Sequence, residues 1–196
     1  MKKNILLINS PIEFNQKYNT ILDTNYPPLG LAYLAAIAIE NDFNVDILDF
    51  SINYYSPDFI KEKMYLDIQI IGISATTLSF KNALLIAKNI RKYRNDIIII
   101  IGGPHITAKP DDFNNDLFDY GIIGEAEYSF LDLINNIKSG KNNIENIDGL
   151  IFKKNNKIVI NQKTNYIQNI DNLPMPAIEK INNFDRYSPT RISVKC

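Results

Sequence analysis

The sequence predicts an α/β protein with a five-stranded parallel sheet, helices on both faces, and a β-hairpin after it. Residues 97–101 are five consecutive isoleucines, a β-branched run typical of a strand that is buried on both faces of a parallel sheet. Strand-like segments also alternate with helix-like segments five times, at spacings that suit right-handed β–α–β units.

The first half of the chain begins with a strand over residues 4–10, followed by a long polar loop. The pair Pro27-Pro28 fixes an extended entry to an Ala/Leu-rich helix that runs to Glu40. Residues 44–49 form the second strand. We expect Ser56 to cap the next helix, with a proline in the first turn.

The third strand covers residues 68–74 and ends in a stretch rich in hydroxyl groups, residues 74–79. A helix then runs to about Tyr93 and is expected to be capped by Ser79 or Thr77. Three or four hydroxyl groups are more than one cap requires. A ligand contact at this strand end therefore stays open beside the capping role.

The fourth strand is the isoleucine run, and residues 111–113 read as a short helical turn. A fifth strand over 120–123 precedes a helix from about Tyr128 to Lys138, which ends at Gly140. Further predicted segments are a hairpin over 149–160 with an Asn-rich turn, an extended linker over 173–177, and the first strand of another domain over 191–196.

A Gly-Gly-Pro-His-x-Thr loop, residues 102–107, follows the isoleucine strand. Gly102 and Gly103 carry no Cβ, so the backbone can adopt left-handed angles and approach another surface closely. In open α/β sheets, ligands bind just beyond the carboxyl ends of the strands. The loop is therefore a candidate ligand cradle, with a tight turn that merely requires glycine as the equal alternative.

Composition excludes several classes of partner. The 196 residues carry a formal net charge of -1, which predicts no electrostatic attraction to nucleic acid or to an anionic membrane. No apolar run reaches the roughly 20 residues needed to span a bilayer. The single cysteine, Cys196, is the last residue, so no internal disulfide can form and a reducing, cytoplasmic location is expected.

The familiar catalytic and nucleotide-binding motifs are absent from this sequence. No G-x-G-x-x-G follows the first strand, and there is no Walker A lysine loop. His105 is the only histidine, so it cannot belong to a multi-histidine metal site; a local hydrogen-bonding role and a ligand contact are equally supported. Glu125 and Glu127 are better explained by the dipole of the following helix than by acid–base catalysis.

Several stretches of the sequence form a pattern when they are taken in order: residues 27–36 (PPLGLAYLAA), 72–76 (GISAT), 102–107 (GGPHIT), 124–127 (GEAE), 147–151 (IDGLI) and 173–177 (LPMPA). Together they resemble the cobalamin-binding domain of radical S-adenosylmethionine (SAM) enzymes. Each stretch is weak evidence alone, but their order and spacing make a specific pattern that covers essentially the whole chain.

The resemblance implies a Rossmann-like, flavodoxin-type strand order, with the nucleotide tail of cobalamin in the crevice at the carboxyl ends of the strands. By the same resemblance, the Gly102-Gly103 backbone lies flat against that tail, and residues 124–127 close the far wall. The residues implied to contact the cofactor are Ser10, Pro11, Leu29, Gly30, Ser74, Thr76, Thr77, Gly102, Gly103, His105, Thr107, Gly124, Glu125 and Glu127.

One departure concerns cobalt ligation. Cobalamin domains of the mutase and methionine-synthase type carry Asp-x-His-x-x-Gly after the first strand, and its histidine ligates cobalt from below. This sequence has no histidine there. A bound cobalamin is therefore expected to lack a histidine lower ligand from that loop.

The resemblance also implies a domain plan. Residues 1–142 would be the cobalamin-binding domain, and 143–196 a hairpin and linker to a radical SAM barrel that lies beyond this chain. Cys196 falls where the first cysteine of a four-iron (4Fe-4S) cluster would be in such a longer protein. The barrel would bring SAM and a small-molecule substrate, while the present chain would bind cofactor and catalyse nothing.

Two alternatives remain at this point. One is a docking or structural domain that presents substrate or partner to the barrel without cobalamin. The other is a stand-alone small-ligand sensor of the same fold.

Overall fold

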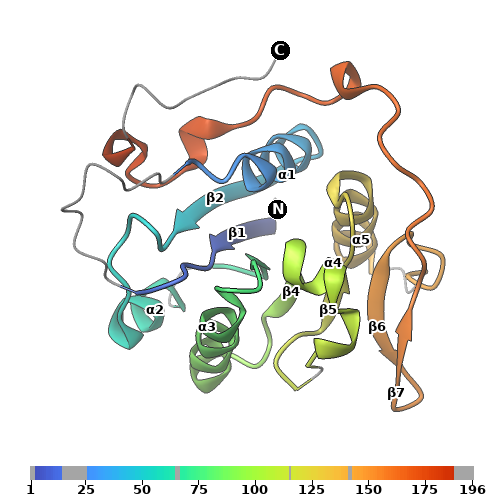
Figure 1. Cartoon of the computed structure of the whole chain (residues 1–196), viewed down its shortest axis with the longest axis horizontal. Helices are drawn as coiled ribbons and strands as arrows, with labels where there is room; N and C mark the ends of the chain where they lie inside the picture. The colour runs from blue at the N-terminus through green and yellow to red at the C-terminus, as the bar shows by residue number, and fades with distance from the viewer. Residues whose placement is uncertain (1–2, 15–25, 65–66, 115, 141–142, 188–196) are drawn as a thin grey trace.

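The computed structural model describes residues 3–14, 26–64, 67–114, 116–140 and 143–187. Within them lies one sheet of seven strands in the order β2-β1-β3-β4-β5-β6-β7 (Figure 1). The strands are β1 (Lys3–Asn9), β2 (Phe43–Asp49), β3 (Ile70–Ser74), β4 (Ile98–Gly102), β5 (Tyr120–Ile122), β6 (Leu150–Lys154) and β7 (Lys157–Ile160). The first five pair in parallel, in the flavodoxin-type order.

The strand count differs from the sequence prediction, which gave a five-stranded sheet and a separate hairpin. In the structure, β6 pairs antiparallel with β5, so the hairpin extends the same sheet. The physical reason is that β5 has only three residues and would otherwise present an unpaired edge. The turn of the hairpin uses Asn155 and Asn156 in left-handed conformation, with φ of 50° and 62°, as its Asn-rich sequence predicted.

Helices cover both faces of the sheet (Figure 1). Helices α1 (Leu29–Glu40) and α5 (Glu127–Ser139) pack on one face, and α2 (Pro57–Met64) and α3 (Phe80–Tyr93) pack on the other. Alternate residues of β1 supply the two cores: Ile5 and Leu7 face α1 and α5, whereas Leu6 and Ile8 face α2 and α3.

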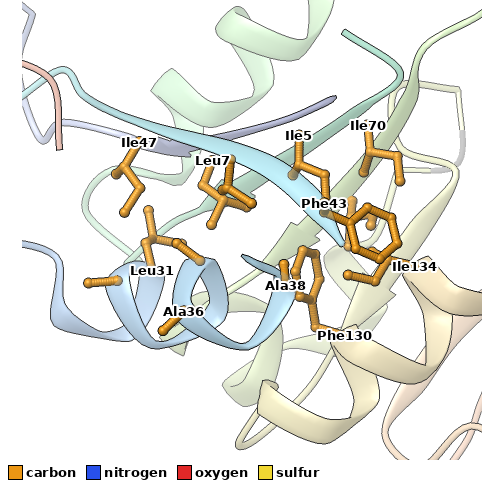
Figure 2. Packing of buried hydrophobic residues seen from close by; sticks show 14 of the residues in the cluster. Ile5, Leu7, Leu31, Ala36, Ala38, Phe43, Ile47, Ile70, Phe130 and Ile134 are labelled. Atoms are coloured by element: carbon orange, nitrogen blue, oxygen red, sulfur yellow. The ribbon is translucent and has the colours of Figure 1, made fainter. Parts of the chain in front are cut away.

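Close packing on the α1 face depends on small side chains. Ala32, Ala35 and Ala38 of α1 are fully buried, which lets this helix approach the sheet closely. Figure 2 shows Leu31 of α1 below Leu7 and Ile47, and Phe130 of α5 beside Ala38 of α1, all in one core cluster. The gap between α1 and α5 at the carboxyl end of the sheet is where the candidate site lies.

Local signals at helix ends mostly match their sequence predictions. Ser56 caps α2, because the Phe59 N–H donates to its hydroxyl at 3.0 Å. Gly140 ends α5 in left-handed conformation with φ of 66°. Ser79 occupies the N-cap position of α3, but its side chain makes no capping hydrogen bond into the helix.

The glycine-proline loop after β4 was predicted as a loop but is partly helical. Pro104–Ala108 form the short helix α4, and Pro110–Asp112 form a 3-10 turn directly after it. Pro104 stands in the first turn, where its fixed φ suits a helix and its missing N–H removes no helical hydrogen bond. The side chains that follow Pro104 are therefore held in a helix and do not belong to an open loop.

The segment after the hairpin crosses the molecule and returns to the opposite edge of the sheet (Figure 1). The Ala177 N–H donates to the Ala32 carbonyl at 3.0 Å, and Ile181 forms a parallel bridge with Ile47 of β2. At its end, the Tyr187 hydroxyl donates to the buried Asp49 carboxylate. The linker is thus extended, as predicted, but fixed; the strand predicted over 191–196 lies outside the described residues.

A polar network fixes the start of this returning segment. The Asp148 carboxylate accepts hydrogen bonds from the Thr164 N–H and hydroxyl, at 2.8 and 2.7 Å, and pairs with Lys163 at 3.1 Å. Burial by itself raises the pKa of Asp148, but the hydrogen bonds from Thr164, Lys163 and Asn165 outweigh it and hold the pKa at about 2. The charged carboxylate therefore stabilises the folded state.

We expect the Asp148→Asn variant to lower the free energy of unfolding near neutral pH by about 1–2 kcal/mol. Because the pKa is lower in the folded state, the contribution of Asp148 is complete above about pH 4, the unfolded-chain value, and disappears as the pH falls towards 2. Urea unfolding of both proteins from pH 7 to pH 2.5 tests this expectation. A stability difference that does not shrink on acidification contradicts it.

Candidate functional site

A cavity of about 350 Å³ opens at the carboxyl ends of β1, β3, β4 and β5, on the face covered by α1 and α5. In the sheet order, β1 and β3 are neighbours whose connections leave in opposite directions. This is the topological switch point at which doubly wound folds bind ligands. The cavity therefore lies where the fold, independently of sequence detail, provides a binding crevice.

The floor of the cavity is apolar. It is formed by strand and helix side chains that also belong to the core between the sheet and these two helices: Leu7, Leu31, Leu34, Ile100, Ile122 and Phe130. No lysine or arginine is among the described lining residues. A flat apolar group fits such a floor, whereas an anion would find no cationic partner there.

Glycines shape two parts of the wall in different ways. Gly103 has φ of 94°, and a Cβ on it would come within 2.8 Å of both the Ala75 carbonyl oxygen and the Ser74 hydroxyl. Gly30, at the start of α1, is different, because a Cβ there would meet no atom within 4 Å. Gly103 is thus required by the fold itself, while Gly30 leaves space at the cavity.

The polar rim carries hydroxyl, amide and carboxylate groups. Ser74 and Asn9 come from strand ends, and the Asn9 amide donates to Asp49 at 3.0 Å. Glu125 accepts a hydrogen bond from the Ile167 N–H at 2.8 Å. The Oε2 atom of Glu127 is buried and has no hydrogen-bond partner within the part of the chain that the structure describes. The rim therefore contains an unsatisfied acceptor.

Thr107 connects two loops at the rim without lining the cavity. Its hydroxyl donates to the Gly103 carbonyl at 3.0 Å and accepts from the Gly124 N–H at 2.9 Å. Thr107 thereby fixes the turn at residues 124–127 to the loop that follows β4.

Replacing Thr107 by valine keeps the shape of the side chain but removes both hydrogen bonds. Because Thr107 is exposed and water can replace part of the loss, we expect a destabilisation of only about 1 kcal/mol. The Gly124 amide should also exchange faster with deuterium, which NMR measures directly. Thr107→Ser retains the hydroxyl and should behave like the natural protein; equal Gly124 exchange in both variants would argue against the contact.

Three predicted site residues lie near β1 or α1 but do not line the cavity. The Ser10 hydroxyl is buried and donates to the Ser79 carbonyl at 3.0 Å. Pro11 is buried, and its carbonyl accepts from the Asn82 amide at 3.0 Å. Leu29 is exposed at the first position of α1. Ser10 and Pro11 therefore join the loop after β1 to α3.

The hydroxyl-rich stretch after β3 is divided in a similar way. Ser74 lines the cavity, whereas Thr76 and Thr77 are exposed and lie outside it. The Thr76 N–H donates to the Ser79 hydroxyl at 2.9 Å, which closes a local turn. The surplus of hydroxyl groups is therefore explained partly by this turn and partly by the cavity.

His105 lies on the other side of the strand ends, against α3. Its ring is buried and stacks on Phe80 with 3.8 Å between centroids. Its Nδ1 atom is 3.4 Å from the Thr77 hydroxyl, and its Nε2 atom is 3.1 Å from Asp112, without hydrogen-bond geometry. The sequence left open a local role and a ligand contact for His105, and the contacts seen here are all local.

The structure brings together seven of the predicted residues at the cavity: Gly30, Ser74, Gly102, Gly103, Gly124, Glu125 and Glu127. The apolar floor was not predicted as part of a site, because its residues follow the same pattern as any core. One signal in the sequence was usable: successive side chains of β1 point to opposite faces of the sheet, and Leu7 is on the face that α1 covers. Cys196 lies outside the described residues.

The described ranges contain neither a cluster of metal ligands nor a membrane-spanning helix. No group of three or more histidine, cysteine, aspartate or glutamate side chains is placed to hold a metal ion. None of the helices described there combines the length and apolarity required to cross a bilayer.

The fold is a doubly wound α/β domain, and its apolar cavity lies at the switch point where such domains bind ligands. These two features are those of a ligand-binding domain. The family model of the B12 binding domain matches residues 19–134. This chain belongs to the B12-binding domain family.

Similar proteins are longer than this chain. An uncharacterized methyltransferase of Pyrococcus horikoshii, PH0819, is 31% identical over 186 residues, which are 93% of this chain and 39% of that protein. The radical SAM methyltransferase TsrM from Kitasatospora setae, solved with cobalamin and a [4Fe-4S] cluster, has a TM-score of 0.68 at 18% identity. The match covers 89% of this chain and 31% of TsrM.

The cobalamin-dependent SAM radical enzyme OxsB, solved with aqua-cobalamin and SAM, has a TM-score of 0.66 at 19% identity. That match covers 91% of this chain and 24% of OxsB. At this level of identity the two solved structures establish a shared fold.

Proposed function

We propose that this domain binds cobalamin by inserting the nucleotide tail of the cofactor into the cavity between α1 and α5. The observation that carries the proposal is an apolar cavity of about 350 Å³ at the switch point, within a segment of the B12-binding family. Cobalamin as a whole is far larger than this volume. Only the tail, with its flat dimethylbenzimidazole ring, fits inside, and the corrin ring would lie over the strand ends.

The residues present suit such a ligand. Leu7, Ile100 and Phe130 offer apolar contact to the aromatic ring, and Gly102 and Gly103 let backbone lie close to the tail. Ser74 and the turn at 124–127 supply polar contacts at the rim. We assign Ser10, Pro11, Thr76 and Thr107 to holding these loops in place, from the hydrogen bonds of their own atoms or of their neighbours.

For the whole protein we propose a cobalamin-dependent radical SAM enzyme. Residues 1–142 would be its cofactor domain, and residues 143–196 would lead to a barrel in the same polypeptide that holds a 4Fe-4S cluster, SAM and a small-molecule substrate. Cys196 would be the first cluster ligand. Cobalamin, when bound, supplies such enzymes with a carrier for a methyl group or with a means of radical rearrangement or cyclisation. The scarcity of cysteine favours the cytoplasm.

A titration with hydroxocobalamin, followed by desalting and a visible spectrum, tests the proposal. We expect roughly one cobalamin to be retained per chain. The reduced cob(II)alamin form should show no nitrogen splitting in its electron paramagnetic resonance spectrum, because the only histidine packs against Phe80. No retained colour in a protein with a cooperative thermal transition would refute cobalamin binding by this chain.

A second candidate is a docking domain without cofactor. Ile12, Tyr54 and Leu78, on loops that follow β1, β2 and β3, are 56%, 68% and 72% exposed. Apolar side chains at this edge suit a covering protein surface. The same titration separates the two candidates, since the docking domain would retain no cobalamin.

A further inference from the structure

The dipole of α5 explains an acidic residue at Glu127, but it does not explain why one of the carboxylate oxygens is buried without a partner in the described part of the chain. Glu127 is the first residue of α5 and lines the cavity, and its Oε2 atom is buried without a hydrogen-bond partner among the described residues. A buried carboxylate oxygen without a donor destabilises the folded protein. Such an atom in a native protein calls for an explanation, and a bound group that supplies the missing donor is one.

The neighbouring acidic residue shows the contrast. Glu125 lies two residues earlier and also lines the cavity, but its carboxylate accepts the Ile167 N–H at 2.8 Å. Glu125 therefore has a structural partner in the returning segment. Glu127 is the acceptor that the described fold leaves open.

The charges of the cavity limit what can occupy the position beside Glu127. The described lining residues include two carboxylates and no lysine or arginine. A phosphate placed against this wall would be repelled, and no cation would compensate. A carboxylate accepts hydrogen bonds and cannot donate when ionised. A cationic donor would also suit this wall, but the proposed ligand, cobalamin, carries no ammonium or guanidinium group. The donor that cobalamin can offer to Glu127 is therefore uncharged, namely a hydroxyl or an amide N–H.

We propose that Glu127 is a specificity-determining residue that accepts a hydrogen bond from an uncharged donor of the ligand and keeps its phosphate away from α5. This inference rests on the proposed cobalamin function. Two parts of cobalamin carry such donors: the ribose hydroxyls of the nucleotide tail and the amide groups around the corrin ring. The phosphate of the tail would then face the Ser74 and Gly103 side of the cavity.

The test compares the wild-type chain with Glu127→Gln and Glu127→Ala, using hydroxocobalamin and cobinamide as probes. Cobinamide retains the corrin amides but lacks the dimethylbenzimidazole nucleotide. We expect Glu127→Ala to weaken cobalamin binding roughly tenfold or more, and Glu127→Gln, which keeps an acceptor oxygen, to weaken it less. Glu40→Ala, an exposed glutamate at the far end of α1, is the matched control and should bind like wild type.

The two probes distinguish the two donors. If cobinamide binding is unaffected by the substitution, the donor is a ribose hydroxyl; if it weakens by the same factor as cobalamin binding, the donor is a corrin amide. Both results support the role of Glu127. Cobalamin binding by Glu127→Ala within twofold of wild type overturns it.

Stability without ligand provides an independent measurement. Glu127→Gln replaces a carboxylate by a neutral amide, and an unpaired neutral group costs less free energy to bury than a charged one. The melting temperature of ligand-free Glu127→Gln should therefore equal or exceed that of wild type. A melting temperature that falls by several degrees would overturn the proposal, because it would show that Glu127 serves the structure of α5. If wild type retains no cobalamin, the proposed function fails first, and the melting temperatures alone decide whether the Glu127 carboxylate is unsatisfied.

Discussion

The Gly30→Phe variant should lose cobalamin binding while keeping its fold. Gly30 lines the cavity at the first turn of α1, and a side chain there has open space, since a Cβ meets no atom within 4 Å. A phenyl ring at this position would occupy the volume that the nucleotide tail needs. We expect affinity to fall roughly 100-fold, equivalent to about 2.7 kcal/mol.

The free energy of unfolding of the ligand-free Gly30→Phe variant should rise slightly or stay the same. Phenylalanine is a better helix former than glycine, so α1 gains slightly from the substitution. The measurement is a hydroxocobalamin titration followed by visible absorbance, with thermal melting of the ligand-free protein beside it. Leu29→Phe is the matched control, because Leu29 is the neighbouring residue on α1 but does not line the cavity. Wild-type affinity in Gly30→Phe would mean that cobalamin binds elsewhere.

The Gly103→Ala variant should unfold far more readily than the natural protein. Gly103 has φ of 94° and ψ of -177°, a backbone region that is essentially restricted to glycine. An added Cβ would lie 2.8 Å from the Ala75 carbonyl oxygen and 2.9 Å from the Ala75 nitrogen. These backbone atoms are fixed, because the Ala75 N–H donates to Gly102 and its carbonyl accepts from His105, each at 3.1 Å.

Backbone strain and overpacking together predict a loss of about 3–5 kcal/mol, a large part of the 5–15 kcal/mol that stabilises a typical domain. Urea unfolding measures the loss. Gly102→Ala is the control, since its Cβ would lie at an ordinary 3.7 Å from the Ile122 carbonyl oxygen. A difference between wild type and Gly103→Ala below 1 kcal/mol would contradict the strained geometry.

These two glycines also decide how binding should be tested. A Gly103 variant could lose cobalamin either because the site is blocked or because the contact between the segments after β3 and β4 is damaged. A Gly30 variant separates the two effects, because the surrounding space accommodates a side chain. Both glycines belonged to the resemblance, and only their surroundings show that one is needed by the fold and the other by the cavity.

Sequence patterns were sufficient for the parallel core of the fold. The isoleucine run became β4, the Ala/Leu-rich run became α1, and Gly140 ended α5 as predicted. These features depend on local periodicity and on backbone preferences, which a sequence displays directly. The sequence patterns did not predict where the hairpin pairs, because its antiparallel contact with the edge of β5 is long-range.

The candidate site divides in the same way. The glycine-rich strand ends were correctly expected to meet at one edge, since the carboxyl ends of parallel strands share an edge of the sheet. His105 and Thr107 lie in the same short stretch as Gly103, yet α4 turns them away from the cavity. The floor residues Leu7, Ile100 and Phe130 were indistinguishable from core residues until the helices were placed.

By itself, the sequence determined the parallel α/β fold, its helix and strand order, and the resemblance to a cobalamin-binding domain. Only the tertiary structure decided which side chains share the cavity, that Glu125 is satisfied by Ile167, and that Glu127 is left with an open acceptor. The physical reason is one of range. Helix and strand signals act over a few residues, whereas a cavity forms where distant segments leave space between them.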